Sequence, residues 1–327
     1  RSLRRHVNRY FRDKRLRHIM EFPVLFLGAA PQHTPALYSL MNYADMGLGT
    51  WYPMGGMGRV VDAMRSVAED MGVSIRTGVA VERIDVAQGR AVGVIANGER
   101  QAADAIVAAA DYHHVERDLL PEEHRSYSAG YWNNRVMAPS VLMFFLGIDR
   151  RLPGLDHHTL FFDRPFDQHS HEIYTAPRWP KAPLFYTSCT SKTDPTVAPA
   201  GGESLTILIP IAAGLEDTEG TREHYYGMVM ERIEREVGFE IRAHVKVKRS
   251  YSVRDLIADH NSFRGNAYGL ANTLAQTGPL RPKVKSRKVK GLYFAGQLTV
   301  PGPGVPPALI SGQVVADLIA REQHERK

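Results

Sequence analysis

The stretch from residue 291 to residue 316 constrains the fold of this chain more than any other part. Leu292 to Ala295 form an apolar run that predicts a short strand, and Gly296 ends it. A loop rich in proline and glycine follows, and Pro307 opens a run with apolar residues at helical spacing. We therefore predict a strand, a tight loop and the first turn of a helix.

A junction of this kind has two interpretations. The first turn of a helix leaves N–H groups unpaired and exposes the positive end of the helix dipole, which suits an anion or the polar part of a cofactor. Gly302, Gly304 and Gly312 would let a ligand or a neighbouring strand approach the backbone closely. Many sheets also end this way with nothing bound, and the local pattern leaves both interpretations open.

Several other runs in the chain occur in an order that is typical of one group of flavoproteins. They are Leu27-Gly-Ala-Ala-Pro31, Ala36 to Leu40, Gly49 to Gly56, Tyr268-Gly-Leu270, Gln276 and Arg281-Pro282. Together with residues 291–316 they resemble the motifs of the bacterial-type phytoene desaturases, the FAD-dependent carotenoid desaturase and isomerase group. The resemblance spans nearly the whole chain.

The resemblance implies an α/β (α+β) fold with an FAD-binding doubly wound domain and a substrate domain of mostly antiparallel sheet. Members of the group begin with a strand, Gly-x-Gly-x-x-Gly and a helix, which together hold the flavin pyrophosphate. The 327-residue sequence contains no such run. We therefore expect an incomplete FAD-binding domain, short of about one mononucleotide-binding half. An N-terminal segment or a separate Rossmann partner chain would complete it, and the chain alone could be inactive.

The resemblance also implies which residues contact FAD and substrate. The cofactor-binding residues would be Val81, Gly296, Gln297, Gly304, Val305, Pro306 and Pro307, and the substrate residues Trp51, Gly55 and Gly56. Many related proteins have an acidic residue at the position of Gln297, and either type can hydrogen-bond the ribityl hydroxyls. For Val81 a plain strand is the alternative, and for the glycine pair a plain helix entry.

Asp13 and Arg17 lie four residues apart, so on a helix they would share one face. Spacing alone favours a surface ion pair. The run from Phe11 to Arg17 also resembles the group's Phe-x-Asp-x-x-Leu-Arg motif, which implies that this acid and base handle protons beside a polyene.

The reaction implied by the resemblance is the desaturation of a long isoprenoid such as phytoene or a carotenoid. Hydride would leave an allylic carbon for the flavin N5, and a proton would leave the neighbouring carbon. A carotenoid isomerase, a retinoid saturase, and a noncatalytic half of a split flavoprotein would share the same motifs and stay open.

The composition of the chain limits which partners it can bind and in which cellular compartment it is expected. Net charge is +6 and the pI near 9.3, but the basic residues lack a nucleic-acid motif, so no nucleic-acid partner is expected. The single cysteine, Cys189, indicates a reducing, cytoplasmic compartment. No apolar run reaches the roughly 18 residues of a bilayer span. A long apolar substrate favours a peripheral membrane protein, with the basic amphipathic residues 3–20 on the lipid surface. A surface helix packed against the protein's own core is the alternative for these residues.

Histidines at positions 157, 158, 169 and 171 lack a metal-ligand framework, so surface or packing roles and no metal are predicted.

Periodicity predicts the following elements. Helices are expected over residues 3–20, 36–45, 59–71 and 221–237, and strands over 73–76, 79–84, 91–95 and 105–108 and over 141–148, 159–162, 184–188, 205–209 and 245–251. The first strand group is interpreted as one strand of the main sheet and a three-stranded meander, with turns at Gln88-Gly89 and Asn97-Gly98.

Four segments follow from these elements. Residues 1–48 are predicted to be a helical part facing substrate or membrane, 49–111 a part of the FAD domain with the meander, 112–255 the substrate-binding domain, and 256–327 the return to the FAD domain.

Overall fold

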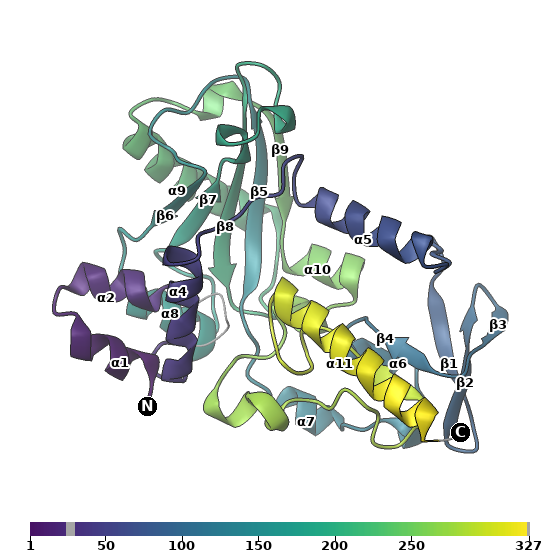
Figure 1. The fold of residues 1–327 in the computed structure, drawn as a ribbon. Coiled ribbons are helices and arrows are strands. Elements are labelled where there is room, and N and C mark those ends of the chain that lie inside the picture. The colour runs from purple at the N-terminus through teal and green to yellow at the C-terminus, as the bar shows by residue number, and fades with distance from the viewer. Residues whose placement is uncertain (24–29, 326–327) are drawn as a thin grey trace. The chain divides into compact units, whose positions relative to one another are not determined.

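The computed structural model describes residues 1–23 and 30–325, so most of the run from Leu27 to Pro31 lies outside the described residues. The chain forms two compact units (Figure 1). Unit 1 comprises Arg1–Ser39, Thr77–Pro139 and Asp255–Lys327, and unit 2 comprises Leu40–Arg76 and Ser140–Arg254. Each unit is described by itself below.

Unit 1 begins with two short helices instead of one continuous helix. Helix α1 spans Leu3–Tyr10 and α2 spans Lys14–Glu21. The side chains of Ser2 and Asp13 cap their first turns by accepting backbone N–H groups. Leu3 and Val7 are buried against neighbouring apolar side chains of this pair and of the 3₁₀ helix η1 (Ala36–Ser39). The cap at Asp13 is what divides the predicted helix.

The antiparallel meander of unit 1 consists of β1 (Val81–Ala87), β2 (Arg90–Ala96) and β3 (Glu99–Ala102). Both predicted turns are present, because Gln88, Gly89, Asn97 and Gly98 all have positive φ as a type I′ turn requires. The third strand, β3, was not predicted. Residues 73–76 do not form the predicted strand, and residues 106–108 form a strand outside the meander.

That strand, β4 (Ile106–Ala108), pairs in parallel with β10 (Leu292–Phe294), which lies far along the chain. The other edge of β10 is occupied, since Phe294 N–H donates to the Val284 carbonyl at 2.7 Å and Ser286 N–H donates to the Leu292 carbonyl at 3.0 Å. Within the described residues β4 pairs only with β10, so its outer edge is open. Helix α11 (Val305–His324) follows β10 and packs Val315 against it.

Unit 2 is built on a five-stranded antiparallel sheet with strand order β6-β7-β8-β5-β9. The strands are β5 (Ser140–Ile148), β6 (His158–Phe161), β7 (Phe185–Ser188), β8 (Glu203–Ile211) and β9 (Val245–Tyr251). All five predicted strands of this region are confirmed. Side chains alternate between the two faces of such strands, and one face carries the buried core under helix α9 (Glu219–Val237).

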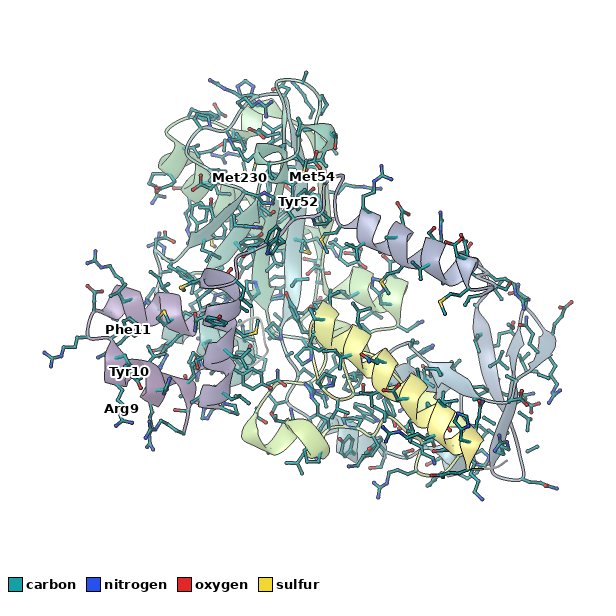
Figure 2. All side chains as sticks on the ribbon, viewed as in Figure 1. Arg9, Tyr10, Phe11, Tyr52, Met54 and Met230 are labelled. Carbon is teal, nitrogen blue, oxygen red and sulfur yellow. The ribbon has the colours of Figure 1, made fainter. Side chains whose placement is uncertain are left out.

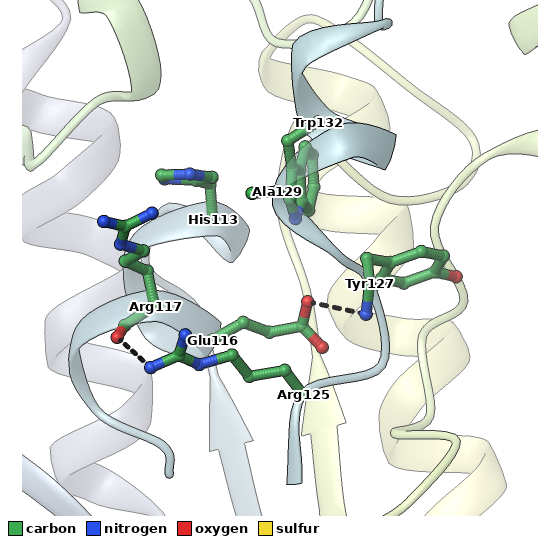
Figure 3. Close-up of a pocket in the computed structure, with 7 residues that line it drawn as sticks. All are labelled: His113, Glu116, Arg117, Arg125, Tyr127, Ala129 and Trp132. Carbon is green, nitrogen blue, oxygen red and sulfur yellow. Dashed lines mark hydrogen bonds between the residues drawn. The ribbon is translucent and has the colours of Figure 1, made fainter. Parts of the chain in front are cut away.

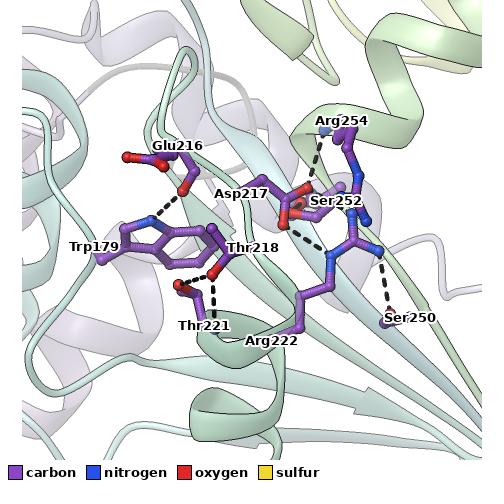
Figure 4. Close-up of polar contacts among 10 residues, drawn as sticks. Trp179, Glu216, Asp217, Thr218, Thr221, Arg222, Ser250, Ser252 and Arg254 are labelled. Atoms are coloured by element: carbon purple, nitrogen blue, oxygen red, sulfur yellow. Dashed lines mark hydrogen bonds and ion pairs between the residues drawn. The ribbon is translucent and has the colours of Figure 1, made fainter.

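A buried ion pair fixes the first turn of α9 (Figure 4). Arg222 bonds both carboxylate oxygens of Asp217 at 2.8 and 2.6 Å, and its Nη1 donates to Ser250 of β9 at 3.2 Å. The backbone N–H of Arg254 donates to the same carboxylate at 3.0 Å. Burial tends to raise the pKa of Asp217, but these hydrogen bonds outweigh it and the pKa is lowered. The pair therefore joins α9, β9 and the start of helix α10 (Val253–His260).

The remaining helices are short or lie outside the sheets. They are α4 (Leu40–Met46), α5 (Gly58–Asp70), α6 (Tyr112–Asp118), α7 (Ala129–Asn133), α8 (Phe166–Tyr174), α10 (Val253–His260), and the 3₁₀ turns η2 (Glu122–His124), η3 (Thr190–Lys192), η4 (Pro195–Val197), η5 (Arg242–His244), η6 (Phe263–Gly265), η7 (Leu274–Gln276) and η8 (Gly278–Leu280).

Candidate functional site

The loop after β10 is held in place at its first residue. Gly296 has φ +114°, and its N–H donates to Ser311 Oγ of α11 at 2.8 Å. Its carbonyl accepts from the Thr299 N–H at 3.1 Å and from Thr299 Oγ1 at 2.8 Å. Ser311 and Thr299 are buried. The loop that the sequence singles out is therefore fixed at its start by the helix that follows it.

Helix α11 begins at Val305, two residues before the predicted start at Pro307, with Gly304 as N-cap at φ +110°. Pro306 and Pro307 have no N–H, and the Ala308 N–H donates to the Gly304 carbonyl at 3.0 Å. The expected set of unpaired N–H groups is thus reduced. In the first four residues of α11, only the Val305 N–H has no hydrogen bond within the described residues.

Residues 269 and 281, from the runs at 268–282, pack closely against the backbone of this loop. Gly269 has φ +89°, and a Cβ atom there would lie 2.7 Å from the Gln297 carbonyl oxygen. Arg281 is fully buried, and its guanidinium lies 3.1–3.2 Å from the place where a Cβ of Gly302 would be. Only glycine fits both positions without displacing the loop. The motifs at 269 and 281 thus have a structural task that their sequence did not indicate.

Among the described residues, the Arg281 guanidinium donates to carbonyl oxygens and pairs with no carboxylate. Its Nη2 donates to the Leu270 carbonyl at 2.7 Å and to Asn272 Oδ1 at 3.1 Å. Burial lowers the pKa of Arg281 to about 10, so the guanidinium stays charged near neutral pH. The amide of Gln276 holds the same segment by bonding the Val136 N–H at 3.0 Å and the Val136 carbonyl at 2.9 Å.

These residues fit a flavin better than they fit a free phosphate. Apart from its two chain neighbours, no atom of the described residues lies within 4 Å of the place where a Cβ of Gly296 would be, so the backbone there is open to a ligand. Gln297 offers a half-buried amide next to it. One free N–H at Val305 suits a single acceptor atom, whereas a pyrophosphate needs several donors. Val81 lies at the start of β1, and the hydrogen bonds found in the described residues do not link it to this loop.

Asp13 and Arg17 are not paired with each other, because Asp13 caps α2 from outside the helix. Its carboxylate accepts from the Arg15 N–H at 2.7 Å and pairs with Arg15 Nη2 at 3.1 Å. Hydrogen bonds from the Arg15 side chain hold the pKa of Asp13 below its usual value, which weakens it as a base. Arg17 Nε donates to the Phe11 carbonyl at 2.8 Å. The ion pair that spacing favours between Asp13 and Arg17 is therefore not formed among the described residues, while a catalytic role for the two stays a prediction.

In unit 2 the run containing Trp51, Gly55 and Gly56 is fastened to the loop after β7. The Gly55 N–H donates to Asp194 Oδ2 at 2.5 Å, and the Tyr52 ring meets the His157 ring edge-on with centroids 4.9 Å apart. Both glycines have positive φ, at +87° and +93°. Trp51 projects from this run with 89% of its surface exposed.

The face of the five-stranded sheet opposite to α9 is open and carries a mainly apolar row of side chains beside a more polar one. Its side chains form two rows across the strands. The first row is Leu160, Tyr186, Leu208, Met143 and Tyr251, and the second is His158, Ser188, Thr206, Phe145 and Arg249. Leu160 is 40%, Phe145 41% and Val247 56% exposed. Large apolar side chains on an open sheet face indicate a binding surface.

Two histidines that the sequence assigned to surface or packing roles lie at the edge of this face. His158 Nδ1 lies 2.5 Å from the Tyr186 hydroxyl, and His157 Nδ1 lies 2.6 Å from Thr193 Oγ1. Burial lowers the pKa of both, so both rings are neutral near pH 7. The contact of His158 with Tyr186 depends on the register of β6 against β7, which spacing along the chain does not reveal.

The small pocket beside α6 and α7 is structural (Figure 3). Its volume of about 30 Å³ holds one water molecule. The buried carboxylate of Glu116 accepts the Ser126 N–H at 2.6 Å and the Tyr127 N–H at 3.2 Å. These bonds fix the segment between the helices, and the space is too small for a cofactor.

Known proteins resemble this chain over nearly its whole length. Residues 1–320 match the family described as "Flavin containing amine oxidoreductase". The chain is 38% identical to a carotenoid 3,4-desaturase of Haloarcula japonica, over 98% of this chain and 65% of the relative. It is 33% identical to a zeta-carotene-forming phytoene desaturase of Myxococcus xanthus, over 97% of this chain and 62% of the relative. The chain therefore spans less than two thirds of the length of these relatives.

Solved structures with low sequence identity share the fold. An oxidoreductase from Methanosarcina mazei superimposes with a TM-score of 0.61 at 19% identity, over 97% of this chain and 68% of that chain. A putrescine oxidase variant gives 0.61 at 17% identity, over 98% and 68%. The expected α/β (α+β) class and the resemblance to carotenoid desaturases are confirmed. The chain belongs to the flavin-containing amine oxidoreductase family.

Proposed function

We propose that this chain is the larger part of an FAD-dependent oxidoreductase that desaturates a long isoprenoid, a phytoene or carotenoid, by hydride transfer to the flavin. The mainly apolar row on the open face of the five-stranded sheet in unit 2 is the observation that carries the proposal. A long hydrocarbon offers no charge or hydrogen bond to hold, so its site must be an extended apolar surface that excludes water. The desaturase names of the relatives support this substrate class.

Bound FAD would supply the hydride acceptor. The Gln297 amide would bond the polar ribityl chain, and the free Val305 N–H would donate to an acceptor atom at the ring edge. Gly269 and Arg281 would act indirectly, by fixing the backbone of Gln297 and Gly302. Trp51, Gly55 and Gly56 would line the path of the substrate in unit 2.

We further propose that a nucleotide-binding segment, in the same polypeptide or as a partner chain, completes the parallel sheet of unit 1. Purely parallel sheets are buried on both faces and rarely consist of two strands. Because Ile106 and Ala108 bond β10, the N–H and C=O of Val107 point to the open edge of β4. Leu309, Ile310 and Val314 of α11 are exposed as well. An added strand would use this edge.

A flavin spectrum tests the proposal. The purified chain is mixed with FAD, freed of the excess and scanned from about 300 to 500 nm, with and without the separately expressed N-terminal segment of the Haloarcula relative. We expect the flavin band only when the segment is supplied, and then turnover of a linear polyene. If no band persists in either sample, the function is withdrawn.

Replacing Val107 by proline should abolish completion of the site. Proline removes the outward N–H of β4 and leaves the inward bonds to β10 in place. We expect flavin retention with the supplied segment to fall at least about tenfold, which is a loss of roughly 1.4 kcal/mol. Val107→Ala keeps the N–H and is the control. Equal retention in both variants would show that the edge of β4 is not used.

We also propose that the protein is cytoplasmic and rests on an anionic membrane surface through α1 and α2. No helix of the described residues is long and apolar enough to cross a bilayer. Tyr10, Leu16 and Ile19 are exposed among arginines, and Figure 2 shows Arg9 and Tyr10 at the end of α1. Such a pair of helices suits lipid headgroups.

Charge reversal tests the membrane contact. Arg9→Glu with Arg12→Glu should weaken binding to anionic vesicles by at least about 3 kcal/mol, since each basic residue near the surface contributes roughly 1 kcal/mol and each reversal adds repulsion. Arg59→Glu with Arg65→Glu on α5 makes the same change in net charge elsewhere. Cosedimentation with vesicles measures both. Equal losses would mean that net charge alone governs binding.

A further inference from the structure

The second row of the open sheet face in unit 2 is more polar than an all-hydrocarbon ligand requires. His158, Ser188, Thr206 and Arg249 share it with Phe145, while the neighbouring row is apolar except for the hydroxyls of Tyr186 and Tyr251. A site shaped only for hydrocarbon would gain from apolar side chains throughout. The polar side chains of the second row therefore raise the question of which polar group of a ligand they contact.

The hydrogen bonds assign the proton on His158. Burial raises the pKa of Tyr186, so the phenol is protonated near neutral pH. A phenol hydroxyl is a stronger donor than a neutral imidazole N–H, and an imidazole nitrogen is a better acceptor than a phenol oxygen. That proton is then donated to His158 Nδ1, 2.5 Å away. In a neutral ring the other nitrogen, Nε2, carries the remaining hydrogen. The described residues give Nε2 no hydrogen-bond partner, and His158 is exposed.

This tautomer makes His158 a hydrogen-bond donor toward the open face. Nε2 already holds a proton and Nδ1 is occupied by Tyr186, so neither nitrogen is free to take a proton from a substrate carbon. A donor fixed on an apolar face suits an uncharged acceptor oxygen.

We propose that His158 Nε2–H bonds an oxygen of the substrate, so that the sheet face selects an isoprenoid carrying a hydroxyl or carbonyl oxygen over the plain hydrocarbon of equal length. The inference rests on the proposed isoprenoid function and names the substrate class within it. Tyr186 is a positioning residue, because it acts through the tautomer of His158. Without an acceptor oxygen, the donor would be desolvated and left unpaired, which costs affinity.

Equilibrium binding of two linear polyenes to the full 327-residue chain tests the inference. One is a hydrocarbon and the other its terminal monoalcohol with the same chromophore, each followed by its absorbance shift in detergent. We expect the alcohol to bind about tenfold more tightly. His158→Phe should remove this preference while hydrocarbon affinity stays the same or rises. His158→Gln, which keeps a donor, should restore part of it, and Tyr186→Phe should reduce it.

His224→Phe on the exposed side of α9 is the matched control and should leave the preference unchanged. Equal affinity of wild-type protein for both polyenes would overturn the inference and leave the isoprenoid function standing. A preference that survives in His158→Phe would overturn it too. Failure of the wild-type chain to bind either polyene would count against the proposed function itself, and the inference would fall with it.

Discussion

Replacing Arg222 by leucine is expected to lower the free energy of unfolding by about 3–5 kcal/mol. The change leaves the Asp217 carboxylate, whose side chain is 2% exposed, without the guanidinium that bonds both its oxygens. The link to Ser250 of β9 is lost as well. Urea denaturation followed by circular dichroism measures the effect.

Arg235→Leu is the control for this prediction. Arg235 pairs with Glu231 one turn away on the exposed side of α9, so its loss should cost no more than about 0.5 kcal/mol. The gap between Arg222→Leu and wild type should narrow in acid. The lowered pKa of Asp217 in the wild type gives stability that is present above its unfolded pKa and is lost as pH falls through the folded pKa, below 3.8. A loss of under 1 kcal/mol in Arg222→Leu would contradict the prediction.

Replacing Gly269 by alanine should impair the cofactor loop more than any single change within the loop itself. The new Cβ would lie 2.7 Å from the Gln297 carbonyl oxygen, a distance that forces the backbone of Gln297 to move. Since Gln297 is the residue expected to bond the ribityl chain, we expect flavin affinity in the completed protein to fall by at least about tenfold. Quenching of flavin fluorescence measures it.

Gly238→Ala separates this effect from plain backbone strain. Gly238 has φ +80°, close to the φ of +89° at Gly269, but no atom lies within 4 Å of the place where its Cβ would be. Both variants should lose about 1–2 kcal/mol of stability from the left-handed conformation. Only Gly269→Ala should lose flavin. If the two variants bind flavin equally, the close contact of Gly269 with the loop does not contribute to flavin affinity.

The contrast between the two sheets shows what sequence can predict here. Four strands of unit 2 were predictable because each lies in a segment with a short apolar run, and β9 was predictable from its alternation of valine and lysine. The strand β3, with the sequence Glu99-Arg-Gln-Ala102, carries no apolar signal and was missed, although the turn at Asn97-Gly98 pointed toward it. Its pairing comes from the hairpin geometry and not from its own composition.

The candidate site shows the limit of prediction more sharply. The loop from Gly296 to Gly304 was recognisable because glycine and proline restrict local conformation. The contact of Gly269 with Gln297 and the hydrogen bond between His158 and Tyr186 each join residues about 28 positions apart. Such contacts depend on register and tertiary packing, which local patterns do not contain. The ion pair predicted between Asp13 and Arg17 is not formed for a different reason, since a residue that caps a helix also fits the spacing of a residue inside it.

The division of the chain has a consequence for its synthesis. Unit 1 is assembled from three segments and unit 2 from two, so the polypeptide passes between them four times. Strand β4 leaves the ribosome long before its only described partner, β10, is made. Until then the open edges of β4 are unpaired, and the nascent chain must avoid aggregation through them. Unit 2 has all its strands by Tyr251 and can fold first, leaving unit 1 to close only when β10 and α11 have been translated.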